Sequence, residues 1–267
     1  MLLRTGAPLV GEPVMGAAED PDESAFVSRG VTCCFLPAFC LVRAGRPYRR
    51  WSQSTAGYDT TPMVNLWAPM TPRPRAAATA WILGATAYLT AEAVTASAYR
   101  PSYSYAHDYI SDLGVPGQPL AALMNAGFAV QGVLFLLGAV LAGGSRHRTL
   151  TACAAANAVG NILVGTVPAG GGALHLVGAT LAIVGGNAAA LAGASLFTGL
   201  AYRLTSCVLG GVGLLSLTVL AVHAWTGVEV LPAPVWERAS VYPILTWQVC
   251  AALAMLTALL PARRQHP

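Results

Sequence analysis

The sequence predicts an all-α protein, a polytopic membrane bundle of six transmembrane helices. Three observations predict this fold class: six long apolar segments follow residue 73, they contain almost no formal charge, and arginines gather in alternate connections between them. A helix rises about 1.5 Å per residue, so about 20 apolar residues cross the roughly 30 Å hydrocarbon core of a membrane. We therefore expect residues 73–267 to form a six-helix transmembrane domain.

The six predicted spans are long enough to cross a bilayer, and Glu92 is the one formally charged residue inside them. In chain order they cover residues 76–98, 120–142, 150–167, 173–196, 204–225 and 239–260. The connections after the second and fourth spans are short, which favours antiparallel packing of consecutive helices.

The fourth span carries a face of small residues. Gly178, Gly185 and Ala192 recur at heptad intervals, so they share one side of a helix. Small side chains let two helices approach closely in lipid, where packing drives association. We expect this face to pack tightly against a neighbouring helix; a glycine-lined substrate path is the alternative.

Residues 1–72 differ in composition from the rest of the chain. They mix arginines, acids, prolines and glycines, and their apolar residues follow neither a helical nor a strand period. The one apolar run, 31–42, is too short to span a membrane and contains Pro37. We expect this N-terminal extension to be disordered, or to reflect a start codon assigned upstream of Met63 or Met70. A regulatory cytoplasmic tail is the alternative.

The arginines predict the orientation of the bundle. One set of connections and ends holds Arg73, Arg75, Arg146, Arg148, Arg203, Arg263 and Arg264, whereas the opposite connections hold Arg100 and Arg238. Cytoplasmic loops carry the excess of positive charge, so we expect a multi-pass plasma-membrane protein with both termini in the cytoplasm. Arginine supplies all 15 basic residues, a usage typical of GC-rich bacterial genomes. The net charge of +4 reflects the arginines on the predicted cytoplasmic side and does not indicate nucleic-acid binding.

Polar and ionisable residues gather toward the predicted outer side of the membrane. Such groups are costly in lipid unless they pair or face water, so their positions indicate sites. We expect an outward-facing polar pocket, roofed by the first and third outer loops. Its candidate residues are Glu92, Arg100, His107, Asp108, Ser111, Asp112, Asn125, Asn161, His175, Glu237 and Arg238.

The first outer loop, 99–117, is the richest stretch in polar and aromatic residues. If 107–113 forms a helical turn, His107 and Ser111 share one face while Asp108 and Asp112 share another. Gly114 would then end the turn. One interpretation is a turn in which Ser111 and Asp112 bond backbone amides, and the other is a site for a lipid headgroup, a metal ion or a nucleophile.

This loop also carries a family resemblance. The run Tyr109-Ile-Ser-Asp-Leu-Gly-Val, with Met124-Asn-Ala-Gly-Phe and Gly132 after it, resembles the prokaryotic membrane family catalogued as domain of unknown function 998 (DUF998). That family has a similar loop, an asparagine opening the next span, a later histidine that matches His175, and a final element that Trp236-Glu237-Arg238 and Trp247 resemble. The resemblance covers about 76–260.

The same loop is similar, over a shorter run, to the Ile-Ser-Asp-Thr-Gly loop of the eukaryotic Frag/DRAM/Sfk six-span proteins. Leu113 replaces the threonine of that loop in this chain. Those proteins are tied to autophagy and to the remodelling of glycolipid anchors. The resemblance therefore implies an association with lipids and no particular activity.

Three classes of function stay open, and lipid binding without catalysis is the one that we expect. In that class Arg100 and Arg238 would attract phosphate and the pocket would hold a headgroup. The second class is a metal-dependent intramembrane lipid hydrolase or transferase, whose ligands would come from His107, Asp108, His175 and His223. The third is a small transporter with Glu92 as a proton relay.

No standard motif supports the enzymatic class. The histidine spacing matches no zinc motif, and Ser111 lacks the nucleophile elbow of a serine hydrolase. The cysteines show no metal-type spacing either. We therefore assign no catalytic residue, metal or cofactor, and we expect a membrane lipid as the partner.

Overall fold

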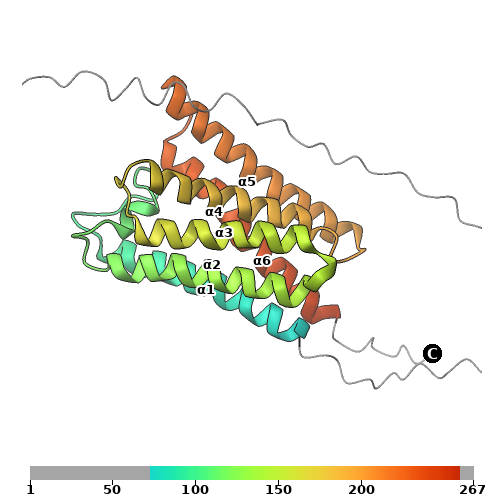
Figure 1. Ribbon diagram of the computed structural model, residues 1–267. Coiled ribbons are helices and arrows are strands. Elements are labelled where there is room, and N and C mark those ends of the chain that lie inside the picture. The colour runs from blue at the N-terminus through green and yellow to red at the C-terminus, as the bar shows by residue number, and fades with distance from the viewer. Residues whose placement is uncertain (1–72, 259–267) are drawn as a thin grey trace, which may run out of the picture. The chain divides into compact units, whose positions relative to one another are not determined.

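The computed structural model describes residues 73–258, and within that range the chain is helical and contains no strand (Figure 1). Its six α-helices are α1 (Arg73–Ala98), α2 (Ala121–Gly143), α3 (Arg148–Thr166), α4 (Ala173–Gly193), α5 (Leu200–Thr226) and α6 (Ala233–Ala258). Two short 3₁₀ turns, η2 (Ser111–Gly114) and η3 (Gly144–Arg146), precede and follow α2. The predicted N-terminal extension lies outside the described residues.

Five of these helices, α2 to α6, are long and apolar enough to cross a membrane. The all-α polytopic fold is thereby confirmed, and the chain is a multi-pass membrane protein. α1 is of similar length, but Arg73, Arg75 and the buried Glu92 lower its mean hydropathy. It packs against α2 and α6 as part of the same bundle.

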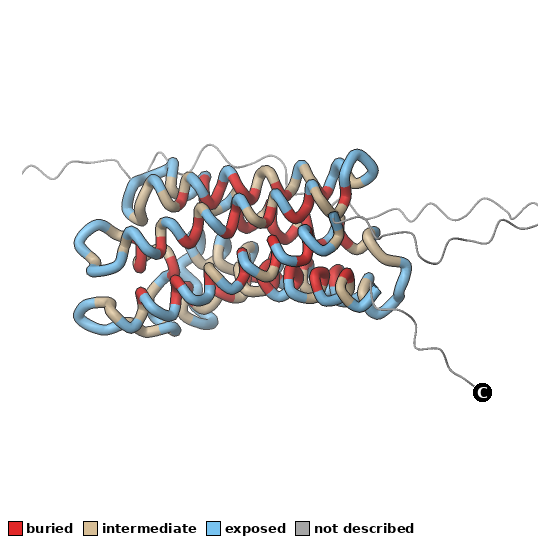
Figure 2. The backbone as a smooth tube through the Cα atoms, turned by 90° about the horizontal axis from the view of Figure 1, so that it is seen from below, coloured by how far each residue is buried: buried red, intermediate tan, exposed pale blue. Residues whose placement is uncertain are grey.

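Consecutive helices pack side by side, and α6 returns to contact α1 and α4 as well as α5. Buried residues therefore follow the inward sides of the helices, whereas the turns at both ends are exposed (Figure 2). α5 packs mainly against α4 and α6. Its outer side is exposed at Leu204, Val208 and Leu215, as expected of a helix that faces lipid.

Glycine lets α3 and α4 approach closely. A Cβ added to Gly160 would lie 2.2 Å from the backbone nitrogen of Ala182, and one added to Gly185 would lie 2.6 Å from that of Asn157. A Cβ at Gly178 would lie 2.8 Å from the Cβ of Leu163. The small-residue face predicted for the fourth span therefore packs tightly against α3.

An aromatic cluster fills the half of the bundle that lies away from the 99–120 loop. The ring centroids of Trp81 and Trp247 are 5.2 Å apart, and those of Phe135 and Trp247 are 6.0 Å apart. All three side chains are fully buried. Trp247 occupies the space left by Gly193, where an added Cβ would lie 2.1 Å from the indole.

Two predicted span boundaries differ from the helix ends by four residues or more. α6 begins at Ala233 rather than at residue 239, so Glu237 and Arg238 lie within the helix and not in the third outer loop. α5 begins at Leu200 rather than at residue 204. The boundary of α6 was misplaced because charged residues normally mark the end of a span, whereas Arg238 here meets Glu92 inside the bundle, with Nε 3.6 Å from Oε1.

Candidate functional site

The loop between α1 and α2 is anchored on the end of the bundle. Ile110 and Leu113 are each 1% exposed, so the η2 turn inserts two apolar side chains into the core. The Asn125 amide of α2 donates a hydrogen bond to the Gly114 carbonyl at 3.0 Å. A Cβ on Gly114 would lie 2.1 Å from the Asn125 Oδ1, so this close approach requires glycine. The helical turn covers Ser111–Gly114 rather than the predicted 107–113, so Gly114 is its last residue and His107 and Asp108 lie before it.

The acids of the loop bond its own backbone. Asp108 accepts a hydrogen bond from the Ser104 amide at 2.6 Å, and Asp112 accepts one from the Tyr109 amide at 2.8 Å. Burial raises the pKa of Asp112, an effect that the Tyr109 amide opposes. The Asp112 contact fits the interpretation in which Ser111 and Asp112 bond backbone amides, whereas among the described residues the Ser111 hydroxyl bonds no amide and Asp108 takes that part.

A buried ion pair joins α1 to α6. The Arg238 Nε lies 3.6 Å from the Glu92 Oε1, and both side chains are buried. The Tyr242 hydroxyl donates a hydrogen bond to the same carboxylate oxygen at 2.8 Å. The positive charge of Arg238 is therefore balanced by Glu92 within the bundle.

The remaining donors of Arg238 hold the loop. Nη1 donates to the Asp108 carbonyl at 2.8 Å and to the Pro234 carbonyl at 3.3 Å, while Nη2 donates to the Tyr103 hydroxyl. The guanidinium also lies 5.4 Å from the ring centroid of Tyr103 and 5.2 Å from that of Tyr105. These donors bond the protein itself, so a phosphate would have to compete with them, and the phosphate contact of Arg238 stays a prediction.

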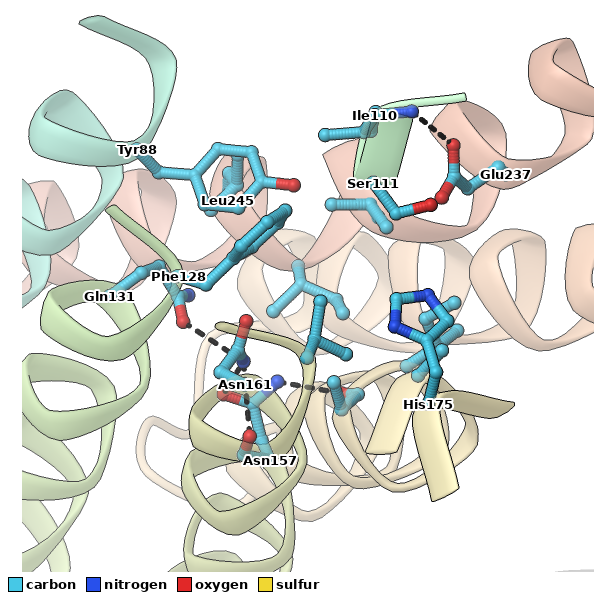
Figure 3. A pocket seen from close by; sticks show the side chains of 16 residues that line it. Tyr88, Ile110, Ser111, Phe128, Gln131, Asn157, Asn161, His175, Glu237 and Leu245 are labelled. Atoms are coloured by element: carbon cyan, nitrogen blue, oxygen red, sulfur yellow. Dashed lines mark hydrogen bonds between the residues drawn. The ribbon is translucent and has the colours of Figure 1, made fainter. Parts of the chain in front are cut away.

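A cavity of about 50 Å³ lies directly beneath the η2 turn (Figure 3). Its walls come from the turn and from α1, α2, α3, α4 and α6. Most of the lining is apolar. The polar side chains that line it are Tyr88, Ser111, Gln131, Asn157, Asn161, His175 and Glu237.

His175 and Glu237 each keep one polar atom free of the protein. The His175 Nδ1 lies 2.7 Å from the Val167 carbonyl, which can only accept, so Nδ1 carries a proton and the neutral imidazole presents a lone pair at Nε2. The Glu237 Oε2 accepts a hydrogen bond from the Ile110 amide at 2.6 Å. Among the described residues, the second carboxylate oxygen has no partner. Figure 3 shows the Ser111 hydroxyl beside the Glu237 carboxylate.

An amide network forms the other side of the cavity. The Asn161 Nδ2 donates to Asn157 Oδ1 at 3.1 Å and lies 3.4 Å from Gln131 Oε1. Gln131 in turn donates to Gln248 at 3.0 Å, and Asn157 donates to the Ala182 carbonyl at 2.6 Å. Figure 3 shows the part of this network formed by Gln131, Asn157 and Asn161, and the bond to Gln248 extends it to α6.

A family model described as "Protein of unknown function (DUF998)" matches residues 82–254, more than half of the chain. The chain belongs to the DUF998 family. No curated protein and no solved structure gave a significant match. The resemblance to the eukaryotic Frag/DRAM/Sfk proteins stays a prediction.

The residues of this DUF998 protein that resemble the family signature have structural partners. The Asn125 side chain of α2 donates a hydrogen bond to the Gly114 carbonyl of the loop, and the Glu237 carboxylate of α6 accepts one from the Ile110 amide. Arg238, next to Glu237, donates a hydrogen bond to the Tyr103 hydroxyl of the same loop. The signature elements therefore attach the η2 turn to α2 and α6, above the cavity.

The predicted site residues of the DUF998 chain separate into three groups. Ser111, Asn161, His175 and Glu237 line the cavity. The pair of Glu92 and Arg238 lies between α1 and α6, and the residues of the loop and its α2 anchor are Arg100, His107, Asp108, Asp112 and Asn125. The cavity is covered by the first loop and by α6, not by the third loop.

The cavity of the DUF998 protein also contains residues that the sequence analysis missed. Gln131, together with its partner Gln248, was overlooked because glutamine carries no charge and lies in otherwise apolar segments. An uncharged amide inside a predicted span is itself a signal, since lipid cannot satisfy it. Tyr88 was overlooked as an ordinary aromatic residue of a span.

The metal-site hypothesis finds no support within residues 73–258, where no three His, Cys, Asp or Glu side chains are placed to hold an ion. His107 lies 3.1 Å from the Ser104 hydroxyl, and His223 lies 3.0 Å from the Val228 carbonyl. With His175 bonded to Val167, the three candidate histidines are held at separate places by local contacts.

Proposed function

We propose that this DUF998 protein binds a membrane lipid, with the headgroup in the cavity and an acyl chain in a groove beside it. The groove, of about 340 Å³, is lined by Leu89, Tyr242, Leu245, Thr246, Val249 and Cys250 of α1 and α6. Leu245 lines both the groove and the cavity, and this shared wall is the observation that carries the proposal. A chamber with several polar side chains in a mainly apolar wall, next to an apolar groove, suits a molecule that is itself polar at one end and apolar at the other.

The surroundings of the groove favour a lipid chain over a soluble ligand. Leu89 and Val249 are 46% and 36% exposed, and they belong to helices that pack as neighbours in the bundle. In a bilayer these surfaces meet acyl chains, so a chain enters the groove without crossing water. The Tyr242 hydroxyl is directed to Glu92, which leaves the groove with mainly apolar walls.

We also propose that the cavity end faces the outside of a bacterial plasma membrane. The ends and connections at the opposite side carry Arg73, Arg75, Arg146, Arg148 and Arg203. The excess of arginine on that side supports a cytoplasmic location for it and for both termini. The headgroup would then come from the outer leaflet.

The proposal is tested by native mass spectrometry of the detergent-purified protein. Val249→Trp fills the groove with a bulky side chain, and we expect it to lower the amount of co-purified lipid by about tenfold. Leu253→Trp is the matched control, because Leu253 lies one turn further along the same helix, is 51% exposed and does not line the groove. Equal lipid retention by both variants, or no lipid on the unchanged protein, would refute the proposal.

A further inference from the structure

We infer that the group bound in the cavity is a primary ammonium, such as the end of an ethanolamine-type headgroup. The inference rests on the proposed lipid binding and adds the chemical class of the ligand. Three properties of the cavity carry it: an unbalanced carboxylate, a set of hydrogen-bond acceptors without protein donors, and a small volume.

The charges around the cavity leave one carboxylate without a cation. Glu92 and Arg238 balance each other, and the Nη donors of Arg238 bond the Asp108 carbonyl, the Pro234 carbonyl and the Tyr103 hydroxyl. Glu237 forms no ion pair within the described residues and receives only a backbone amide. Glu237 is only partly exposed to solvent, and a partly desolvated carboxylate is stabilised by a nearby cation, so the cavity favours a positively charged occupant.

Two further polar atoms of the cavity are acceptors, beside the hydroxyls of Tyr88 and Ser111, which can donate or accept. The Nε2 of His175 presents a lone pair because Nδ1 holds the proton against Val167. The Oδ1 of Asn161 takes part in no hydrogen bond inside the described range, whereas its Nδ2 is already used by Asn157. An ammonium offers three donors and no acceptor, which complements this arrangement. A phosphate would instead face Glu237 and repel it.

The volume of the cavity limits the size of that group. About 50 Å³ holds roughly three or four water-sized groups, at about 10–15 Å³ for each. A two-carbon arm ending in an ammonium has three heavy atoms and fits this space. A trimethylammonium is larger and donates no hydrogen bond, so we expect the site to discriminate between ethanolamine and choline headgroups.

The test compares two lipids with identical acyl chains, one with an ethanolamine and one with a choline headgroup, competing for the detergent-purified full chain. Native mass spectrometry should show at least about tenfold preference for the ethanolamine lipid. Glu237→Gln should remove this preference, because it keeps an oxygen for the Ile110 amide and removes the charge. Glu229→Gln is the control: it makes the same change at an exposed acid outside the cavity and should leave the preference intact.

The outcomes separate the two proposals. Equal binding of the two lipids by the unchanged protein overturns the ammonium assignment but not the proposed lipid binding. This comparison uses the unchanged protein alone, so it does not depend on whether a variant folds. A preference that persists in Glu237→Gln overturns it as well. Absence of any bound lipid refutes the proposed function itself. The last measurement is a thermal-shift assay with free ethanolamine. If free ethanolamine raises the unfolding temperature of a chain that binds neither lipid, the ammonium assignment holds and the ligand is a soluble amine.

Discussion

At the scale of single residues, the pair of Glu92 and Arg238 is the most consequential feature of the bundle. Each side chain would be strongly disfavoured alone in a dry interior, and together they are stabilised by Tyr242 and Tyr103. The same contacts connect α1, α6 and the loop that covers the cavity. Arg238 thus acts as a structural cation, which explains why a charged residue lies inside a helix long enough to span a membrane.

We predict strong coupling between the two members of this pair. Glu92→Gln and Arg238→Met should each lower the free energy of unfolding by about 3 kcal/mol or more, because each leaves one buried charge unbalanced. The double variant should lose clearly less free energy of unfolding than the sum of the two single losses, because it leaves neither charge unpaired. Reversible unfolding in detergent measures the four proteins of this cycle. Additive losses would show that the two side chains do not interact.

At the scale of helices, glycines set the distances between neighbouring elements. The backbone of α4 lies against α3 at Gly160 and Gly185 and against α5 at Gly210, and the Asn187 side chain of α4 fills the space at Gly213. In each case the space that a side chain would need at the glycine is occupied by the backbone or by a polar group of the neighbouring helix. Packing of this kind supplies the association energy that the hydrophobic effect cannot supply in lipid.

Two neighbouring glycines of α5 make a matched pair for testing this packing. A Cβ at Gly213 would lie 1.9 Å from the Asn187 Oδ1, whereas one at Gly211 meets nothing within 4 Å. Gly213→Ala should therefore lower the free energy of unfolding by about 1–3 kcal/mol through overpacking. Gly211→Ala should be neutral or raise it by up to about 1 kcal/mol, because alanine favours a helix. Thermal unfolding in one detergent compares the stabilities of the two variants. Equal changes in stability would show that α5 does not pack on α4 through Gly213.

At the scale of the whole molecule, the two ends of the bundle differ in chemistry. One end carries the arginine-rich connections, and the other carries the anchored loop and the cavity. Between them the amide network ends at Gln248, and the cluster of Trp81, Phe135 and Trp247 fills the half beyond it. A chamber that ends at a packed cluster of aromatic side chains favours binding over passage of a solute through the bundle.

The orientation of these ends is tested by cysteine labelling of intact cells. In a chain whose six native cysteines are replaced, Ser102→Cys and Ser145→Cys place one exposed thiol at each end. A membrane-impermeant maleimide should label Ser102→Cys in intact cells and Ser145→Cys only after permeabilisation, because arginine-rich loops stay in the cytoplasm. The reverse pattern would invert the topology and move the cavity to the inner leaflet.

The fold could be predicted further than the site. Length and apolar content identified all six helices, because a segment that crosses lipid must satisfy its backbone internally and has few alternatives to a helix. The errors lay at helix ends, where Glu237 and Arg238 were assigned to a loop. Which polar side chains meet was less predictable, since Ser111, Asn161, His175 and Glu237 come from four different elements.

The sequence by itself determined the class of the fold, the tight packing of the glycine face and the family, because each depends on local composition or on a short motif. Only the tertiary structure decided the roles of the polar residues. It paired Arg238 with Glu92, turned Asp108 and Asp112 toward their own backbone, and left Glu237 facing the cavity. The reason is physical: in a dry interior the character of an ionisable group is set by the partners that distant helices bring to it.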